Sequence, residues 1–326
     1  MTRIAVIGAG LSGLVTAQFL SRHHEVTVFE KSRGVGGRMA TRYAGEWQFD
    51  HGAQFFTAKS DSFRCFLEPI VKAGVVQAWC GRFIEIDTAE IVASRRWDAS
   101  FPHFVACPNM NSLAKHLAND LNVQVNITVA RLERCPSGWQ LFGKDSLSLG
   151  EFDWVLVTAP AAQTAALLPG DSIISARAKD IKMLPCFALM LGFHRKLELE
   201  WNAALVRNSA ISWVSVNSSK PGRNTDFSLV VHSSNAWAQQ NIDADADGVL
   251  DKLCDATSAA IGQDVRTAAF LKAHRWLYAN VERQDPVPQV DAKNRLAVCG
   301  DWFVHGRVEG AFESAEQVIR ELRQAI

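Results

Sequence analysis

The chain has 326 residues, of which 48% are hydrophobic and 21% charged, and its 34 basic side chains equal its 34 acidic ones. This balance is ordinary for a globular protein and leaves no excess charge to attract nucleic acid or an anionic membrane. The length allows a large core, which we expect to divide into two lobes.

Seven cysteines are scattered along the chain without C-x-x-C spacing. Free thiols in a reducing cytoplasm explain this pattern better than a disulfide framework or a zinc site. The longest uncharged stretch, residues 4–20, is glycine-rich and is not expected to span a membrane. A strand is expected almost at the N-terminus, which leaves no room for a signal peptide. We therefore expect a cytoplasmic protein that binds no metal.

The first motif of the chain is G-x-G-x-x-G, made by Gly8, Gly10 and Gly13 between an apolar strand pattern at residues 4–7 and a helical pattern. In such a unit the first glycine permits a tight turn, the second lets the backbone approach a pyrophosphate, and the third lets the helix pack on the strand. The helix N-terminus offers free N–H groups to the phosphates. Ser12, inside the motif, is expected to lie at the same ligand.

A second predicted strand, residues 25–29, leads to Glu30. A carboxylate at this position accepts hydrogen bonds from a ribose diol and repels a 2′-phosphate, so NADP is disfavoured as the bound dinucleotide. Lys31 and Arg33 reduce that repulsion without removing it. NAD and FAD both remain open from this part of the sequence.

A second glycine-rich segment, K-S-R-G-V-G-G-R, follows at residues 31–38. Gly36 and Gly37 permit backbone conformations closed to bulkier residues, and Arg38 can pair with a phosphate. The alternative is a basic flexible loop. The fingerprint, the acid and G-x-G-G-R together resemble the N-terminal signature of FAD-dependent amine-oxidase-type flavoproteins. The resemblance implies FAD as the cofactor. It also implies an α/β fold, with a glutathione-reductase-like (Rossmann-type) FAD-binding lobe and a mixed antiparallel β-sheet substrate lobe.

Residues 47–56, W-Q-F-D-H-G-A-Q-F-F, combine a turn with a candidate strand. In the resembled family this segment passes the flavin ring, which implies that backbone groups near Gln54 and Phe55 face it. His51 is either a catalytic base or a capping or core histidine.

The middle of the chain predicts a helix at residues 108–121, a strand at residues 123–129 and a three-stranded meander at residues 131–149. In the resembled family the residue that ends this strand, here Val129, meets the adenine through its backbone. The next strand ends at Ala-Pro, as in amine-oxidase-like members, and lacks the Asp-Gly pair of flavin hydroxylases.

The C-terminal part predicts a last core strand that ends in Gly-Asp301, followed by a helix from Val308 to residue 325. In the resembled family this is the second FAD motif, in which the carboxylate accepts a ribityl hydroxyl. The helix N-terminus faces the flavin N1–C2=O edge, where reduction places negative charge. His305 is placed either to contact the polar group of a substrate or to bond a loop carbonyl.

The substrate candidates are basic and aromatic residues in the second lobe and near the second FAD motif. Arg95 and Arg96 either hold an anionic substrate or end a strand in solvent. The whole candidate set is His305, Arg95, Arg96, Trp97, Arg275, Trp276 and Trp302.

The expected FAD-binding lobe is discontinuous, with residues 1–60, 102–160 and 270–326, and the substrate lobe takes residues 61–101 and 161–269. Within the superfamily, the short length and the motifs G-V-G-G-R-M-A-T-R, F-D-H-G-A-Q-F-F-T and G-D-W-F most resemble the bacterial renalases.

That resemblance implies an oxidase that takes hydride from 2- and 6-dihydro isomers of NAD(P) at flavin N5. Its electrons return to O2 as H2O2, and NAD(P)+ leaves. No catalytic base is required, and FAD is expected to be noncovalent because no cysteine falls in the covalent flavin motif of monoamine oxidases. The expected partners are a nucleotide substrate and O2, with no nucleic acid and no membrane. A small soluble amine oxidase and a non-catalytic binding protein with the FAD fold are the alternatives.

Overall fold

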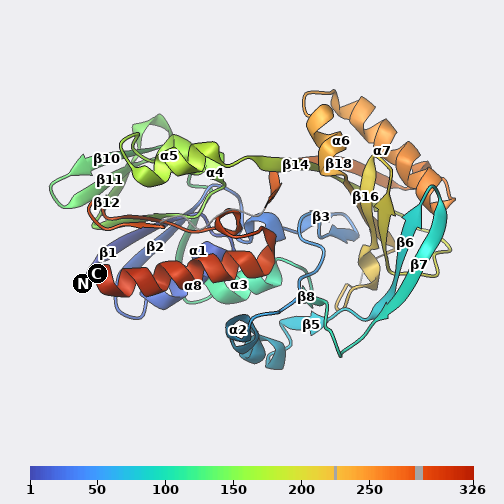
Figure 1. Ribbon diagram of the computed structural model, residues 1–326, viewed down its shortest axis with the longest axis horizontal. Helices are drawn as coiled ribbons and strands as arrows, with labels where there is room; N and C mark the ends of the chain where they lie inside the picture. The colour runs from blue at the N-terminus through green and yellow to red at the C-terminus, as the bar shows by residue number, and fades with distance from the viewer. Residues whose placement is uncertain (224–225, 283–288) are drawn as a thin grey trace. The chain divides into compact units, whose positions relative to one another are not determined.

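The computed structural model describes residues 1–223, 226–282 and 289–326 (Figure 1). Its contacts divide the chain into two compact units. Unit 1 comprises Met1–Arg38, Leu113–Met183 and Asn280–Ile326, and unit 2 comprises Met39–Ser112 and Leu184–Ala279. In the described ranges, no helix is long and apolar enough to cross a membrane.

Unit 1 is built on a six-stranded sheet in the order β19-β20-β13-β1-β2-β9. Its strands run parallel except β19, which pairs antiparallel with β20. The strands are Arg3–Ile7 (β1), Glu25–Glu30 (β2), Asn122–Val125 (β9), Trp154–Val157 (β13), Val290–Asp291 (β19) and Leu296–Val298 (β20).

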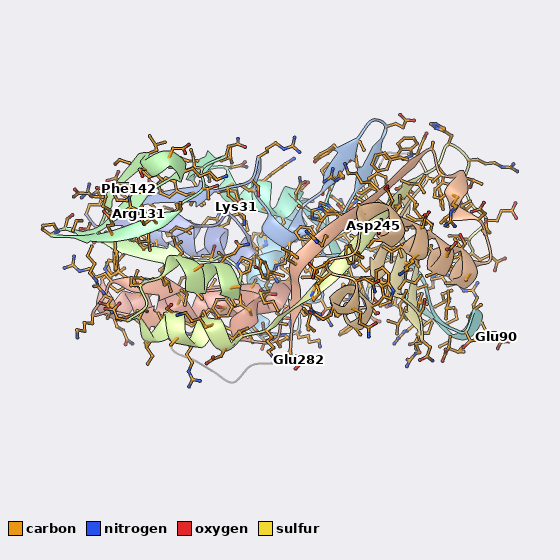
Figure 2. All side chains as sticks on the ribbon, turned by 90° about the horizontal axis from the view of Figure 1, so that it is seen from above. Lys31, Glu90, Arg131, Phe142, Asp245 and Glu282 are labelled. Carbon is orange, nitrogen blue, oxygen red and sulfur yellow. The ribbon has the colours of Figure 1, made fainter. Side chains whose placement is uncertain are left out.

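The centre of this sheet is covered on both faces, since Ile4, Ala5 and Val6 of β1 are all fully buried. The C-terminal helix α8 packs along α1, the helix that follows β1 (Figure 1). An antiparallel meander forms a separate small sheet, at whose edge Arg131 lies over the Phe142 ring at 4.1 Å (Figure 2). The remaining elements are α1 (Leu11–Leu20), α3 (Ser112–Ala118), β10 (Arg131–Cys135), β11 (Gly138–Phe142), η2 (Lys144–Ser146), β12 (Ser148–Phe152), α4 (Ala161–Leu167), α5 (Ile173–Asp180), η5 (Asp301–Phe303) and α8 (Arg307–Ala325).

Unit 2 is built on a seven-stranded mixed sheet in the order β18-β14-β17-β16-β15-β6-β7. One face of this sheet packs under α6 and α7 through residues such as Val214, Val249 and Leu253. Because side chains alternate along a strand, Trp213 and Ser215 of β16 point to the other face. The sheet strands are Gly81–Asp87 (β6), Glu90–Trp97 (β7), Met183–Gly192 (β14), Ala203–Arg207 (β15), Ile211–Val216 (β16), Ser228–Ser233 (β17) and Phe270–Val281 (β18).

Two short hairpin-like pairs, β3–β4 and β5–β8, complete unit 2. The first packs on the large sheet through Trp47 and Phe49, which contact Met190 and Val230. The short helix η1 (Gly37–Met39) spans the end of the first segment of unit 1 and the first residue of unit 2. The elements of unit 2 outside the large sheet are β3 (Arg42–Ala44), β4 (Trp47–Phe49), α2 (Asp61–Lys72), β5 (Val76–Ala78), β8 (Phe104–Ala106), η3 (Asn217–Ser219), α6 (Asn235–Gln240), α7 (Ala246–Ile261) and η4 (Val265–Thr267).

The fold class predicted from sequence is confirmed: a Rossmann-type parallel sheet with a second, mixed β-sheet. The boundaries of the units differ from the expected lobes. Residues 39–60, 102–112 and 270–279 lie in unit 2, and residues 161–183 lie in unit 1. The first difference arises because β3–β4 packs on β17, and the last because α4 and α5 join the core of the parallel sheet. The assignment of FAD and substrate to particular ranges stays a prediction.

Two predicted elements are shorter than expected. The helix predicted at residues 108–121 occupies only Ser112–Ala118. The residues before it are held by tertiary hydrogen bonds, from the Met110 amide to Asp50 and from the Asn111 amide to Thr41 Oγ1. The strand predicted at residues 123–129 is Asn122–Val125, and it ends where Asn126 adopts a φ of +60°.

Candidate functional site

The glycine turn after β1 has the geometry that a dinucleotide requires. Gly8 has a φ of +113°, and a Cβ there would lie 2.6 Å from Thr158 Oγ1. A Cβ on Gly13 would lie 2.1 Å from the Gly8 carbonyl oxygen, whereas one on Gly10 would meet nothing within 4 Å. The turn and the helix–strand contact are therefore closed, while the face at Gly10 is open to a ligand.

The N-terminus of α1 lies at this open face. Its N-cap, Gly10, provides no side-chain cap, and the first turn holds no acidic residue. The first amides of the helix and the positive end of its dipole therefore remain suited to an anion. Ser12 is buried, and its carbonyl accepts a 2.8 Å hydrogen bond from Thr16 Oγ1.

Glu30 joins the end of β2 to the glycine turn. The carboxylate accepts hydrogen bonds from the Ala9 amide at 2.9 Å and the Ser32 amide at 2.7 Å. A carboxylate has about four acceptor positions, so two backbone donors leave capacity for ribose hydroxyls. Lys31 donates to Gln163 Oε1 at 2.8 Å instead of bonding to Glu30.

The two predicted FAD motifs meet within unit 1. Arg38 binds the Asp301 carboxylate through both terminal nitrogens, with Nη1 at 2.9 Å from Oδ2. Gly36 and Gly37 both have positive φ, and the Gly36 amide donates to the Ala9 carbonyl at 2.9 Å, which brings this segment onto the first glycine turn. The pairing of Arg38 with Asp301 was not anticipated, since each residue was predicted to contact the cofactor.

Val129 follows β9 in a segment without regular structure. Its side chain is 8% exposed, and in the part of the chain that the structure describes nothing hydrogen-bonds to its amide or carbonyl. Buried backbone groups are nearly always paired, so this arrangement suits the predicted contact with adenine.

The loop before α8 carries His305. Its Nδ1 lies 3.9 Å from Glu313 Oε2, an ion-pair distance that the sequence did not suggest. The pKa of Glu313 is raised by burial, and His305 opposes that rise. The N-cap of α8, Gly306, has a φ of +71° and a Cβ there would lie 2.8 Å from Asn280 Oδ1; Val308 lies in the first turn.

The segment predicted to pass the flavin lies in unit 2, where the Gln54 side chain is fully engaged. Its Nε2 donates to the Gly52 carbonyl at 3.0 Å, and its Oε1 accepts from Ser215 Oγ at 2.7 Å and Lys220 Nζ at 3.2 Å. These bonds fix the loop that precedes Phe55, so the backbone conformation there is set by side chains from two other elements.

A buried charge cluster, formed by Asp50, Lys220 and Arg223, contacts this loop through the bond from Lys220 to Gln54. The sequence analysis did not predict it. Asp50 accepts from Arg223 Nη2 at 2.5 Å and Lys220 Nζ at 3.5 Å, and all three side chains are 0% exposed. Burial opposes ionisation of Asp50, but the two cations outweigh it and hold its pKa below the usual value. Burial lowers the pKa of Lys220 to about 8, although Asp50 opposes the shift. The only sequence signal was the pair of basic residues in the turn-rich segment S-K-P-G-R.

Three histidines and a tryptophan gather beside the same loop. The His51 ring stacks on Trp276 with centroids 5.1 Å apart and meets His274 edge-on at 4.9 Å. The His51 carbonyl accepts from Trp276 Nε1 at 2.9 Å, and His232 Nε2 lies 3.2 Å from it. Burial lowers the pKa of both His51 and His232 to about 4. Burial and then Arg42 lower the pKa of His274.

At neutral pH these histidines are therefore uncharged. Among the described residues no carboxylate bonds to the buried His51 Nδ1, so none orients the ring as a base. Of the two interpretations of His51, this geometry favours a core histidine.

The remaining substrate candidates are dispersed. Arg95 pairs with Glu85 at 2.9 Å, Arg96 is exposed on the same hairpin, and Arg275 donates to the Ile242 carbonyl at 2.6 Å. Trp302 is 1% exposed and donates to the Ala159 carbonyl at 3.0 Å, which favours a core role. Their contacts with a substrate stay predictions, as do those of Trp97 and Trp276.

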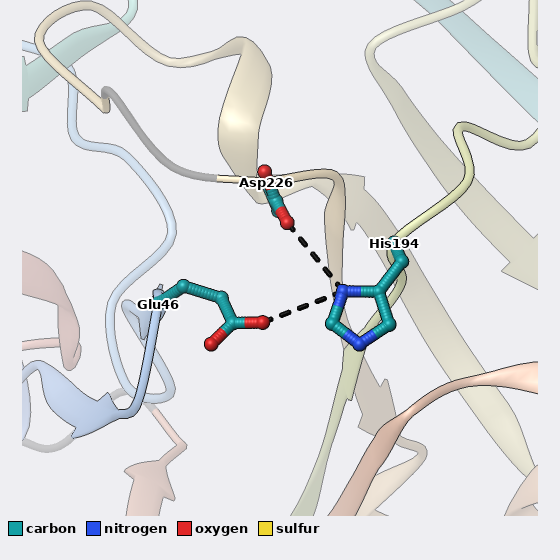
Figure 3. A group of neighbouring side chains, drawn as sticks. All are labelled: Glu46, His194 and Asp226. Atoms are coloured by element: carbon teal, nitrogen blue, oxygen red, sulfur yellow. Dashed lines mark ion pairs between the residues drawn. The ribbon is translucent and has the colours of Figure 1, made fainter.

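Figure 3 shows Glu46, His194 and Asp226, whose side chains converge in unit 2. His194 Nδ1 lies 3.4 Å from Glu46 and 3.6 Å from Asp226. Their potential ligand atoms all lie within 4.8 Å of one another. All three side chains are at least half exposed, so solvated ion pairs explain the group without a metal.

A parallel sheet with an open glycine turn, a ribose-directed acid and a second Gly-Asp motif defines a dinucleotide-dependent flavoprotein oxidoreductase. Two family models match the chain: a NAD(P)-binding Rossmann-like domain over residues 6–68 and a flavin containing amine oxidoreductase over residues 93–322. The chain belongs to the family of flavin-containing amine oxidoreductases. Its cofactor is FAD, which the open Gly10 face and the acceptors of Glu30 fit.

The chain is also similar in sequence to individual known proteins. Mouse renalase is 25% identical over 361 aligned positions that cover all of both chains. A diapophytoene desaturase from Staphylococcus aureus is 51% identical over only 51 residues, 15% of this chain and 10% of its own.

Solved structures share the fold at low identity, and each match covers 99% of this chain and of the other. A putative protoporphyrinogen oxidase from an Exiguobacterium species has a TM-score of 0.79 at 11% identity. Putrescine oxidase with bound putrescine scores 0.72 at 12% identity, and cyclohexylamine oxidase from Brevibacterium oxydans scores 0.70 at 13%.

Proposed function

We propose that this flavoprotein is an oxidase of misreduced dinucleotides, the 2- and 6-dihydro isomers of NAD(P). The substrate gives up a hydride and leaves as NAD(P)+, and the two electrons pass to O2, which takes up two protons to form H2O2. Similarity to renalase along both entire chains supports this proposal.

In this proposal the residues of unit 1 hold the cofactor and do no chemistry themselves. When bound, FAD supplies the hydride acceptor at N5. The amides of the glycine turn and of α1 would bind its pyrophosphate, Glu30 would accept from the ribose, and Asp301 would accept from a ribityl hydroxyl. For Asp301 to do so it must share or exchange its contact with Arg38, whose guanidinium suits a phosphate equally well.

The observation that carries the choice of substrate is the electrostatic character of the loop that contains His51 and Gln54. Within the described residues, the acid beside this loop is Asp50, and its charge is already offset by Arg223 and Lys220. The nearby histidines have lowered pKa values and stay neutral.

Such surroundings offer neither a base nor an anion to an amine substrate. An alkylammonium ion must lose a proton before it can transfer hydride, and with no base in the site the rate depends on the fraction of free amine in solution. A dihydronicotinamide needs neither, because aromatisation of its ring drives the transfer and the site has only to position it.

The alternative is a small amine oxidase. The family description and the structural likeness to putrescine oxidase and cyclohexylamine oxidase favour it, although these likenesses at 12% and 13% identity concern the fold. A non-catalytic FAD protein is disfavoured by the intact pair of motifs.

Anaerobic stopped-flow reduction of the flavin distinguishes these functions. We expect rapid bleaching by 2- or 6-dihydroNAD(P), with a rate that changes little between about pH 6 and 9, and no bleaching by simple amines. After admission of air, H2O2 should appear in equal amount to the substrate consumed. Fast reduction by a primary amine, at a rate rising through the pKa of that amine, would overturn the proposal.

A further inference from the structure

Unit 2 contains an aromatic cluster on the sheet face opposite α6 and α7. It includes Phe55, whose backbone faces the flavin according to the family resemblance. The centroid of the Phe55 ring lies 5.0 Å from the ring centroid of Trp97, 5.1 Å from that of His103 and 5.5 Å from that of Trp213. The members of this aromatic cluster are Phe55, Phe83, Trp97, His103 and Trp213.

His103 is the polar ring of the cluster, and its orientation is fixed. It lies flat on Trp97, with centroids 3.8 Å apart and an interplanar angle of 6°. Trp97 is itself supported by Phe83, whose ring stacks on it with centroids 5.1 Å apart and an interplanar angle of 13°. The imidazole plane is therefore set by packing before any ligand arrives.

The hydrogen bond of His103 also fixes its tautomer. Nδ1 lies 3.1 Å from the Phe101 carbonyl oxygen. A carbonyl can only accept, so Nδ1 carries the proton and Nε2 of the neutral ring is an acceptor. No described residue bonds to that Nε2, and the ring is only partly buried. Burial, against the bond to Phe101, lowers the pKa of His103, which keeps the ring neutral.

An oriented acceptor on a flat aromatic surface fits one feature of the proposed substrate. The nicotinamide ring is planar and carries a carboxamide, whose NH2 group is a hydrogen-bond donor. In the proposed reaction this ring lies against the flavin, which the family resemblance implies to be near the backbone of Phe55, and the His103 ring centroid is 5.1 Å from that of Phe55.

We propose that His103 is a substrate-binding residue whose Nε2 accepts a hydrogen bond from the carboxamide NH2 of the dihydronicotinamide. This inference rests on the proposed function and deepens it. His103 would select carboxamides over otherwise identical rings that lack the N–H donor, because a missing donor leaves the acceptor unpaired.

The test pairs two protein variants with two substrates. His103→Phe keeps a flat ring on Trp97 and removes the acceptor, and His103→Gln restores an acceptor oxygen. The substrates are 6-dihydroNAD and its 3-acetylpyridine analogue, which keeps the carbonyl but has no N–H. Substrate Kd comes from the dependence of anaerobic flavin reduction on concentration. Equilibrium binding of NAD+ and acetylpyridine adenine dinucleotide, followed by the flavin spectrum, gives a second measure.

We expect His103→Phe to raise Kd for the carboxamide about five- to tenfold and to leave Kd for the acetyl analogue within about twofold. His103→Gln should recover part of the loss. His194→Phe is the control, because the His194 ring also lies beside a tryptophan of unit 2, with its centroid 5.1 Å from that of Trp47 at a tilt of 42°, and its side chain is 65% exposed. It should change neither Kd.

If His103→Phe weakened the binding of both substrates equally, His103 would have only a packing role. If it changed neither Kd, His103 would not contact the substrate. Both results overturn the inference and leave the proposed function standing, because the wild-type protein is still reduced. If wild-type flavin is not reduced by any dihydronicotinamide, the proposed function fails and the inference fails with it.

Discussion

The predicted cofactor cradle of unit 1 consists of the glycine turn (Gly8, Gly10 and Gly13), Glu30 and the Arg38–Asp301 pair. It and the buried charge cluster of unit 2 are both polar, but their polar groups differ in exposure. In the cradle, Gly10 faces open space and the Arg38–Asp301 pair keeps 30% of the arginine exposed. In the cluster, Asp50, Lys220 and Arg223 satisfy one another without any exposure. The cradle is built to accept an outside partner, whereas the cluster is built to hold a loop. Substitution of a polar residue should therefore weaken FAD binding in the cradle and lower the free energy of unfolding in the cluster.

Gly10→Val should have the largest effect, because its side chain would fill the space required by the pyrophosphate. We expect essentially all flavin to be lost while the fold is kept, since a Cβ at Gly10 meets no neighbour within 4 Å. The absorbance near 450 nm of the purified protein and its unfolding curve measure the two effects. Gly170→Val is the control: its Cβ also meets nothing within 4 Å, and its flavin content should stay normal. Full flavin in Gly10→Val would show that the phosphates bind elsewhere.

Asp50→Ala should destabilise the protein by about 3–5 kcal/mol, because it leaves two buried cations without their counter-ion. Urea unfolding of the wild-type and variant proteins measures this loss. Asp61→Ala removes an exposed carboxylate paired with Arg64 and should change the free energy of unfolding by less than about 1 kcal/mol. Similar losses in both variants would contradict the contrast between the two regions.

Asp301→Ala should weaken FAD binding by about 1.5–3 kcal/mol, the contribution of a charge-assisted hydrogen bond. Titration of the apoprotein with FAD gives the dissociation constant. Unfolding of the apoprotein should change less than it does for Asp50→Ala, because the partner Arg38 can be hydrated when the pair is broken. A large loss of apoprotein stability with unchanged FAD affinity would assign the pair to folding alone.

Acid should destabilise unit 2 through its neutral histidines. The pKa of His51 and His232 is about 4 in the folded protein against 6.5 in the unfolded chain, so the unfolded chain binds more protons between these values. The free energy of unfolding should therefore fall as pH drops from 6.5 to 4, by up to about 1.4 kcal/mol per pH unit for each histidine. His232→Gln should reduce this slope, and urea unfolding at a series of pH values measures it. An unchanged slope would mean that His232 is protonated in the fold.

The sequence predicted the strand, glycine turn and helix because their determinants are local. Gly8, Gly10 and Gly13 must follow a strand and begin a helix, and the structure gives each the geometry that its position in the motif requires. The pairing of Arg38 with Asp301 depends on segments 263 residues apart, so the spacing of neither motif could reveal it.

The cluster and the shortened helix were missed for the same reason. Asp50 looked like a turn residue, and Lys220 lay in a segment that reads as an ordinary loop. The pattern at residues 108–121 is helical in isolation, but Met110 and Asn111 are held by hydrogen bonds to Asp50 and Thr41, which are far away in the sequence. Local propensity lost to tertiary hydrogen bonds at these positions.

The division of the chain also sets an order for its maturation. Unit 2 ends at Ala279, while unit 1 needs Asn280–Ile326 to supply β20, Asp301 and α8. During synthesis, all of unit 2 is therefore made before Asn280–Ile326 of unit 1. The glycine turn near the N-terminus is made long before Asp301, its partner in the predicted cofactor site. The contact between Arg38 and Asp301 closes a loop of most of the chain, which is slow for entropic reasons. With Asp301 in its proposed role, we expect capture of the flavin to follow synthesis of Asn280–Ile326, and a nascent chain stalled before Asn280 to carry none.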